Sequence, residues 1–473
     1  MTVSRRDFLA TSAASLAFGA MHRAFATNAS IAGSLIDPQA APPTSRGPLA
    51  LPPGFRQVVL SPTGSLMDDG LLVPGKHDGM GAFDAGNGKV LLVRNHEIDP
   101  AMGVAIGAFG PKLEHLGKVD LSRLYDAGPT GVPCLGGTTT LLYDPNRQVV
   151  ERQFLSLCGT SVNCAGGVTP WGSWISCEEC VYRPNEKVFS KDHGYCFEVP
   201  AAMDGPGGGG LIEAKPLKAL GRFTHEAVAF DPKRPVMYLT EDLLDSAFYR
   251  FLPTTPGKLA DGGRLQVLVA IERPSFDSRN WPPLDGKGLP TGPPVIGIRM
   301  GERLTCRWMD IDEVESPKND LRSRAFTRGA IRFARCEGIW HAGDAVYITA
   351  TTGGPNALGQ VWRYVPSPAE GTDAEAATPP TIELFLESHS AANLKNCDNL
   401  CAAPWGELFV CEDGSGADGI VRIKPTGEIH RFALNVTNDS ELAGVCFSPD
   451  GNTLFVNVQN PGMTVAITGP WAR

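Results

Sequence analysis

Six stretches of this chain repeat one pattern, and each is long enough to form a β-hairpin. Each begins with a residue that could bind a metal ion and continues as an apolar run, a turn containing Gly or Pro, and a second apolar run that ends in polar residues. A β-hairpin brings its two ends together, so the first and closing residues of each repeat are expected on the same rim. The repeats are residues 78–97, 164–179, 226–242, 337–351, 398–413 and 441–460.

Hairpins repeated around an axis predict an all-β fold, namely a six-bladed β-propeller with inserted loops and a metal site on the central axis. The chain contains 54 Gly and 39 Pro among 473 residues and shows no long helical periodicity, which favours the same class. The spacing between repeats leaves room for outer strands. Pro-rich segments at 282–294 and 366–380 predict inserted loops.

The N-terminus has the layout of an export signal. Arg5 and Arg6 precede a mildly apolar Ala-rich run and a small-residue site at 24–26, so residues 1–26 are predicted to be a twin-arginine signal. This predicts the twin-arginine export machinery as a partner and a periplasmic or secreted location, without a stable membrane anchor. Residues 27–50 are predicted to be an irregular arm, and residues 51–473 a single propeller domain.

Charge and motifs exclude several classes of function. The formal net charge is −9 and the chain has no Lys/Arg run, so nucleic acid is not expected as a partner. Neither a G-x-S-x-G elbow nor a P-loop is present, which removes the motif basis for a serine hydrolase or a nucleotide site. A monomer is expected. The twelve cysteines leave the disulfide pairing open.

The first residue of each repeat suggests the chemistry of the axis. Asp398, Glu226 and Glu337 would supply the oxygen ligands that Ca²⁺ prefers, whereas a Cys164 thiolate would select a transition metal. The alternative for Cys164 is a buried free thiol or half of a disulfide. Glu178 and Glu179 are both candidate ligands, and one of them could instead be an ordinary surface acid. Arg335 could contact a phosphate group or neutralise one of the acids.

Weaker candidates accompany these residues near the ends of the repeats. Histidines next to acids could orient a ligand or transfer protons, and the closing acids could add ligands. The candidates for such supporting or weaker roles are Asp78, Asn95, His96, Glu97, His225, Glu241, Glu412 and Glu441.

The motifs at 163–179, 221–232, 335–340 and 398–400, behind a twin-arginine signal, resemble the PhoX family of exported alkaline phosphatases. The resemblance implies a six-bladed propeller whose axial cluster of Fe³⁺ and Ca²⁺ acts on small-molecule phosphate esters. It implies that Cys164, Glu226 and Glu337 are iron or shared-metal ligands and that Arg335 contacts the substrate phosphate. By the same resemblance the further cluster ligands are Glu178, Glu179 and Asp398.

The sequence therefore predicts an exported metal-dependent phosphatase that hydrolyses phosphate monoesters. Two alternatives stay open. The same ions could hydrolyse phosphodiesters or lactones, or the chain could be a non-catalytic, calcium-stabilised propeller that binds a partner on its rim.

Overall fold

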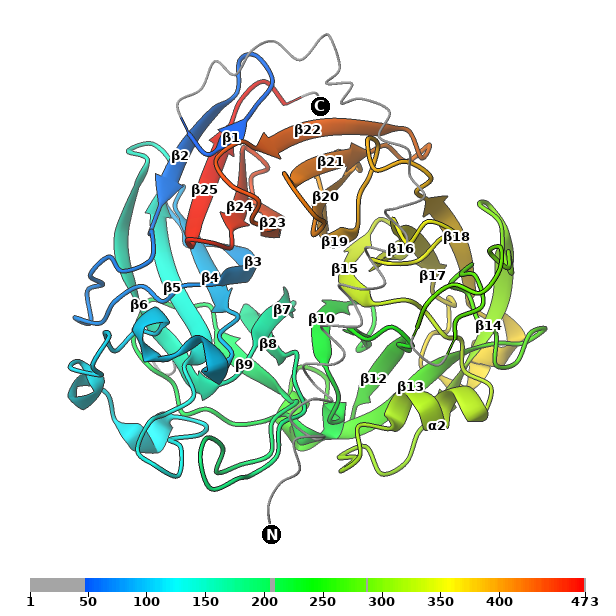
Figure 1. Ribbon diagram of the computed structural model, residues 1–473, viewed down its shortest axis with the longest axis horizontal. Coiled ribbons are helices and arrows are strands. Elements are labelled where there is room, and N and C mark those ends of the chain that lie inside the picture. The colour runs from blue at the N-terminus through cyan, green and yellow to red at the C-terminus, as the bar shows by residue number, and fades with distance from the viewer. Residues whose placement is uncertain (1–46, 205–208, 286–287, 472–473) are drawn as a thin grey trace.

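The strands of the protein form a ring around a central axis (Figure 1). The computed structural model describes residues 47–204, 209–285 and 288–471. Strands make up 40% of the structure and helices 7%, which confirms the predicted all-β class and a propeller-like arrangement. The predicted export signal at 1–26 and residues 27–46 of the predicted arm lie outside the described residues.

The strands fall into six groups, which we call blades 1 to 6. Blade 1 contains β3 (His77–Asp84), β4 (Val90–His96), β5 (Gly136–Asp144) and β6 (Val149–Thr160), and blade 2 contains β7 (Asn163–Val168), β8 (Ser173–Glu178) and β9 (Cys196–Pro200). Blade 3 contains β10 (His225–Phe230), β11 (Met237–Glu241), β12 (Tyr249–Pro253) and β13 (Gly263–Ala270), and blade 4 contains β15 (Cys336–Ala342), β16 (Ala345–Ala350), β17 (Gln360–Val365) and β18 (Thr381–Glu387).

Blades 5 and 6 each take one strand from the N-terminal part of the chain. Blade 5 contains β19 (Cys397–Ala402), β20 (Leu408–Glu412), β21 (Gly419–Ile423), β22 (Ile429–Asn435) and β1 (Leu49–Ala50). Blade 6 contains β23 (Leu442–Phe447), β24 (Thr453–Val458), β25 (Met463–Thr468) and β2 (Arg56–Leu60). A further strand, β14 (Arg303–Asp310), joins the sheets of blades 3 and 4 by pairing with both β13 and β18.

The first strand of each blade lies at the axis. Strands β3, β7, β10, β15, β19 and β23 contact one another in this order, and β23 contacts β3, so they close a circle. Small residues allow this approach: a Cβ on Gly338 would lie 2.4 Å from the carbonyl oxygen of Asp398, and one on Gly79 would lie 2.5 Å from the Cα of Ala165. The circle therefore brings the N-terminal ends of the inner strands to one rim.

The hydrophobic core is divided among the interfaces between neighbouring blades. Blades 3 and 4, for example, enclose Tyr238 and Trp362, and blades 1 and 2 enclose Leu91 and Trp174. Comparable clusters lie between each of the other neighbouring pairs. Because both faces of a sheet are covered in this way, strands such as β4 and β24 are buried along their whole length instead of alternating.

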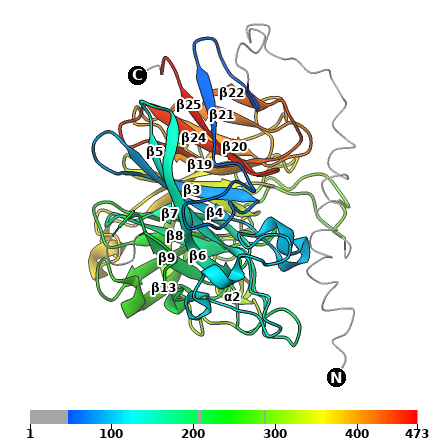
Figure 2. The same cartoon turned by 90° about the vertical axis from the view of Figure 1, so that its left-hand side faces the viewer.

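The ring is closed by strands from the two ends of the chain. Strand β2 pairs antiparallel with β25 over five residues, from Arg56 opposite Thr468 to Leu60 opposite Thr464. Figures 1 and 2 show the two strands side by side, β2 in blue and β25 in red. Backbone hydrogen bonds between distant parts of the sequence thus hold the last blade against the rest of the ring.

Helices are few and short among the described residues. The α-helix is α2 (Leu321–Thr327), and the 3-10 helices are η1 (Pro100–Met102), η2 (Val104–Ile106), η3 (Leu116–Lys118), η4 (Leu121–Arg123), η5 (Lys218–Leu220), η6 (Leu259–Asp261) and η7 (Asp373–Ala377). None of these helices is long and apolar enough to cross a membrane. The twelve cysteines are free thiols, and the sulfur atoms of Cys177 and Cys196 lie 3.6 Å apart across β8 and β9.

We expect Gly338→Ala to destabilise the ring, because the added Cβ would meet the backbone of β19, which cannot move aside as a flexible side chain could. The expected loss is roughly 1–3 kcal/mol of unfolding free energy, read as a lower melting temperature. Gly117→Ala is the matched control, since a Cβ added there would have no atom within 4 Å. Equal melting temperatures for the two variants would contradict the close packing of β15 on β19.

Candidate metal centre

Five inner strands place the first residue of the repeat at the same position, the second residue of the strand. These residues are Asp78, Cys164, Glu226, Glu337 and Asp398. In each case the register shifts at this point, so that the residue and its successor face a single residue of the neighbouring strand. Such a bulge redirects side chains and is common next to functional sites. It explains why all five repeats present a polar group to the axis.

A second set of acids reaches the axis from the neighbouring strand of each hairpin. The backbone N–H groups of Glu97, Glu179, Asp242 and Asp413 donate to the carbonyl oxygens of the residues two positions before the bulge, Lys76, Val162, Thr224 and Asn396 respectively. Thr351 donates to Arg335 in the same way, at 2.9 Å. These hydrogen bonds extend the pairing of each hairpin by one residue pair beyond its strands. They hold the second set of acids beside the residues at the bulges.

Cys164, Glu179 and Glu226 form what we call the thiol trio. One ligand atom of each lies within 4.8 Å of the others. Glu226 is 1% exposed, and its Oε1 atom has no hydrogen-bond partner. Burial and the charge of Glu337 raise the pKa of Glu226 well above its ordinary value, and burial with the charge of Asp78 does the same for the pKa of Cys164. A cation at this trio would supply the missing partner.

Glu337 and Asp398 lie next to the trio, on the side of Arg335. Burial raises the pKa values of both carboxyl groups well above the ordinary range, and the charge of Asp398 adds to the shift of Glu337. The guanidinium of Arg335 donates two hydrogen bonds to Asp242, from Nε to Oδ1 at 2.8 Å and from Nη2 to Oδ2 at 2.8 Å. Nη2 also forms an ion pair with Glu337, and Nη1 lies 3.7 Å from Asp413. The planar fork of Arg335 is therefore held in one orientation at the rim.

Asp78, Glu97 and Glu441 form a second group, which we call the lysine trio. Their ligand atoms also lie within 4.8 Å of one another. Lys76 forms an ion pair with Glu97 at 3.1 Å. Burial raises the pKa of Asp78 to about 7. Burial alone would lower the pKa of Lys76, but the charges of Glu97 and Glu441 raise it above its ordinary value. The two trios are adjacent, since the Cys164 sulfur lies 3.5 Å from Asp78 Oδ1.

Three predicted candidates, the closing acids Glu178, Glu241 and Glu412, point away from the axis. Glu178 accepts from Ser161, Gly194 and Tyr195 N–H groups and contacts His193 Nδ1 at 2.6 Å. Glu241 accepts from Tyr249 Oη, and Glu412 binds Arg431 through both oxygens. Successive strand residues face opposite sides, so the residue after each closing acid faces the axis instead.

The predicted supporting residues Asn95, His96 and His225 also lie behind the axial groups. Asn95 donates to the carbonyl oxygens of Cys164 and Ala165, so it holds the bulge that carries the thiol. The His96 ring lies 2.9 Å from the Gly75 carbonyl and 2.9 Å from Thr139 Oγ1. Burial lowers the pKa of His225 to about 4 and that of His96 well below the ordinary value, so both rings are neutral.

In the sixth repeat the acid stands at a different position of the hairpin from that in the other five. Leu442 pairs with Val458 and Ala443 with Asn457, so Ala443 takes the place that Asp78 has in blade 1. Glu441 stands two residues earlier, where Lys76 and Arg335 stand in blades 1 and 4. Its carboxylate nevertheless reaches the lysine trio. Blade 6 therefore contributes its acid from a different backbone position.

Four residues of the site, Lys76, Asp242, Asp413 and Gln459, are not among those predicted from the sequence. Asp242 and Asp413 directly follow closing acids, in the same way that Glu179 follows Glu178. This pairing of two acids at the end of a hairpin is a signal that could have marked them as candidates, but it does not say which acid of a pair faces the axis. Lys76 and Gln459 carry no comparable signal.

The described axial groups are mostly acids. Nine carboxylates and one thiol interact across the rim, and the cationic side chains among them are Lys76 and Arg335. Buried charges of one sign are costly unless they are paired or bind metal ions. The donor set, oxygen-rich with one sulfur, therefore fits a site for several metal ions, with hard cations on the oxygens and a softer ion on the thiol.

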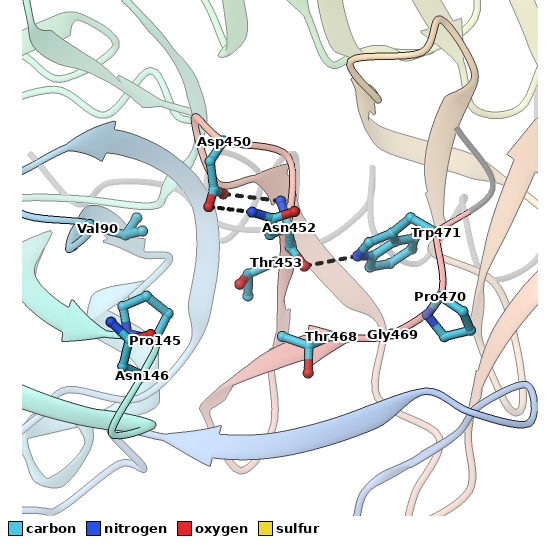
Figure 3. A pocket seen from close by; sticks show the side chains of 11 residues that line it. Val90, Pro145, Asn146, Asp450, Asn452, Thr453, Thr468, Gly469, Pro470 and Trp471 are labelled. Atoms are coloured by element: carbon cyan, nitrogen blue, oxygen red, sulfur yellow. Dashed lines mark hydrogen bonds between the residues drawn. The ribbon is translucent and has the colours of Figure 1, made fainter.

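A separate hollow of about 600 Å³ lies at the opposite rim, between blades 6 and 1. Its lining includes Asp450, Asn452 and Trp471 (Figure 3). Asp450 is bound to Asn452, and Trp471 Nε1 donates to the Asn452 carbonyl oxygen at 2.8 Å. The residues that line this hollow include no group of acids or thiols comparable with the axial site.

Comparison with known proteins gives a family and several solved structures with a similar fold. The family model described as alkaline phosphatase PhoX matches residues 37–132 and 134–462. Pseudomonas fluorescens PhoX in complex with vanadate, a transition state analogue, has a TM-score of 0.63 at 18% identity, covering 91% of this chain and 97% of that chain. That similarity supports the propeller fold.

Two further solved structures have lower TM-scores. Virginiamycin B lyase from Staphylococcus aureus has a TM-score of 0.38 at 10% identity, covering 88% of this chain and 99% of that chain. A gluconolactonase from Xanthomonas campestris has a TM-score of 0.36 at 10% identity, covering 87% and 98%. Among curated proteins, none matches the sequence.

Replacing either of two neighbouring acids in blade 3, Glu241 and Asp242, by its amide should have different effects on metal binding. We expect Asp242→Asn to weaken calcium binding by at least about 10-fold, because Asp242 faces the axis and orients Arg335. Glu241→Gln should leave calcium affinity unchanged and lower stability, because Glu241 holds Tyr249 on the far side of the sheet. Calorimetric titration of chelator-treated protein measures both affinities. The reverse ranking would show that the strand faces have been assigned wrongly.

Proposed function

Because the chain belongs to the family of PhoX alkaline phosphatases, we propose that it hydrolyses phosphate monoesters at a metal centre on the axis of the ring. The observation that carries this proposal is that the thiol trio and Arg335 lie next to each other at the axis. The trio has a buried carboxylate oxygen without a partner, and the neighbouring rim presents an oriented guanidinium. A phosphate ester needs both kinds of group, since its charge must be neutralised and its oxygens positioned.

The proposed ligands divide by chemistry. Cys164, Glu179 and Glu226 would hold Fe³⁺, and the surrounding oxygens of Glu337, Asp398 and Asp242 would favour Ca²⁺. When bound, such ions polarise phosphoryl oxygens and offset the negative charge that develops in the transition state. Glu178, a predicted ligand, is left out of this set because its oxygens are already bonded within blade 2.

Arg335 would bind the substrate phosphate. Its backbone adopts a left-handed conformation, with φ of 54°, which is uncommon for a residue other than glycine and is typical of strained functional positions. Asp242 holds the Nε edge of the guanidinium, and Nη1 lies 3.7 Å from Asp413. In that orientation the guanidinium would donate to a phosphoryl oxygen and to the additional charge formed on it during attack.

The setting of this activity is also part of the proposal. The six blades would form a six-bladed propeller whose axial rim holds the substrate, and the chain would act in the periplasm or outside the cell after twin-arginine export. Export of a folded protein suits a centre whose ligands come from every part of the chain. The proposed substrate is a small phosphate ester, which would bind at the rim where the ligand set and Arg335 lie.

Replacing Arg335 by alanine should lower kcat/KM for a phosphate monoester by roughly 100-fold or more, because one charged donor to the transition state is lost. The assay uses the metal-loaded protein with a panel of monoesters at neutral and alkaline pH. Arg363→Ala is the matched control, since Arg363 lies on β17 and pairs with Asp344 in the turn between β15 and β16.

A phosphodiester and a lactone are assayed in parallel. Turnover of either one in preference to every monoester would replace the proposed reaction. No turnover of any monoester above the Arg335→Ala background would contradict the phosphatase assignment.

Removing the metal ions should abolish activity and lower the melting temperature, because the axial carboxylates would lose the cations that offset their repulsion. Elemental analysis of the untreated protein should find iron together with calcium. Cys164→Ala should lose the iron and keep calcium. Zinc as the sole metal, or calcium alone with full activity, would contradict the proposed cluster.

A further inference from the structure

The two acidic trios on the axis differ in how their charge is balanced. In the thiol trio, Glu226 Oε1 is buried without a hydrogen-bond partner. In the lysine trio, every member receives an N–H donor from the protein itself. The thiol trio therefore needs a cation from solution, whereas the lysine trio already contains one.

The donors of the lysine trio are Lys76 and Gln459. Lys76 Nζ lies 3.1 Å from Glu97 Oε2 and donates to Gln459 Oε1. The Gln459 amide nitrogen donates to Asp78 Oδ2 and Glu97 Oε2, both at 2.8 Å, and also to Glu441 Oε1. The amide is thus oriented by the ammonium and distributes its N–H groups over all three carboxylates. An ammonium and an amide occupy the place that a metal ion would take among these oxygens.

The backbone holds Lys76 in this place. Lys76 stands two residues before Asp78 and has a φ of 50°, as Arg335 stands two residues before Glu337 with a φ of 54°. Blades 1 and 4 lie opposite each other in the circle of inner strands. The Lys76 side chain is 13% exposed, so the ammonium is largely withdrawn from solvent and committed to the trio.

We propose that the lysine trio is closed to metal ions because the Lys76 ammonium serves as its built-in cation, so that metal binds at the thiol trio and the adjoining acids only. The inference rests on the proposed metal centre and states which of the axial acids belong to that centre. It assigns Lys76 the role of balancing the charge of the trio. Gln459 supports this role, because its amide nitrogen donates hydrogen bonds to the three carboxylates. A fixed charge in this position cannot be removed by a chelator.

The test is the number of calcium ions bound per chain, measured by elemental analysis and by calorimetric titration. Lys76→Gln should bind one calcium ion more than the unmodified protein, because the three carboxylates would lose their ammonium. Lys89→Gln is the matched control, since Lys89 pairs with Glu151 away from the axis, and its calcium count should not change. An unchanged count in Lys76→Gln would overturn the proposal.

A second variant decides the question even if Lys76→Gln does not fold. Glu441→Gln in the unmodified background should keep the full metal count, because the lysine trio holds no metal to lose. Loss of one metal ion in Glu441→Gln would overturn the proposal. Both readouts are independent of turnover, so they can fail while phosphatase activity is present, and an inactive protein can still satisfy them.

Discussion

The repulsion among buried carboxylates on the axis is the constraint on which the rest of the structure depends. A ring of inner strands is a simple way to gather acids from distant parts of a chain, but the same closeness makes the assembled ring unfavourable without positive charge. The protein meets this demand in two ways. Arg335 and Lys76 supply positive charges from opposite blades, and under the proposed function an ion would bind the Glu226 oxygen of the thiol trio that has no hydrogen-bond partner.

Much of the fold and part of the site can be predicted from the sequence because both follow from hairpin geometry. The ends of a hairpin must meet, so polar residues at the ends of repeated hairpins collect on one rim. This is why the sequence predicts that Cys164, Glu226, Glu337 and Asp398 lie near one another at the axis. The apolar runs between them predict the all-β class, since each inner strand is covered by neighbouring blades on both faces.

The remaining differences between the predicted and the observed arrangement have local causes. Whether Glu178 or Glu179 faces the axis depends on a single step of register, and the sequence pattern of the repeat does not contain that step. The bulges decide it, and a bulge is visible only when the pairing of both strands is known. In the sixth hairpin the pairing likewise decides that Ala443, and not Glu441, stands where Asp78 stands in blade 1. Lys76 could not be predicted because its partners come from the first and last blades.

The pairing of β2 with β25 has a consequence for the order of events during synthesis. Strand β25 follows every other strand of the ring in the sequence, while its partner β2 precedes most of them, so the ring cannot close before β25 has been synthesised. Until then the acids of blades 1 and 6 are not neighbours, and a cation meets only a partial ligand set. Loop-closure entropy opposes such long-range pairing. Any ion that binds the assembled axis would therefore bind chains whose ring is closed by β25 in preference to chains that lack this strand.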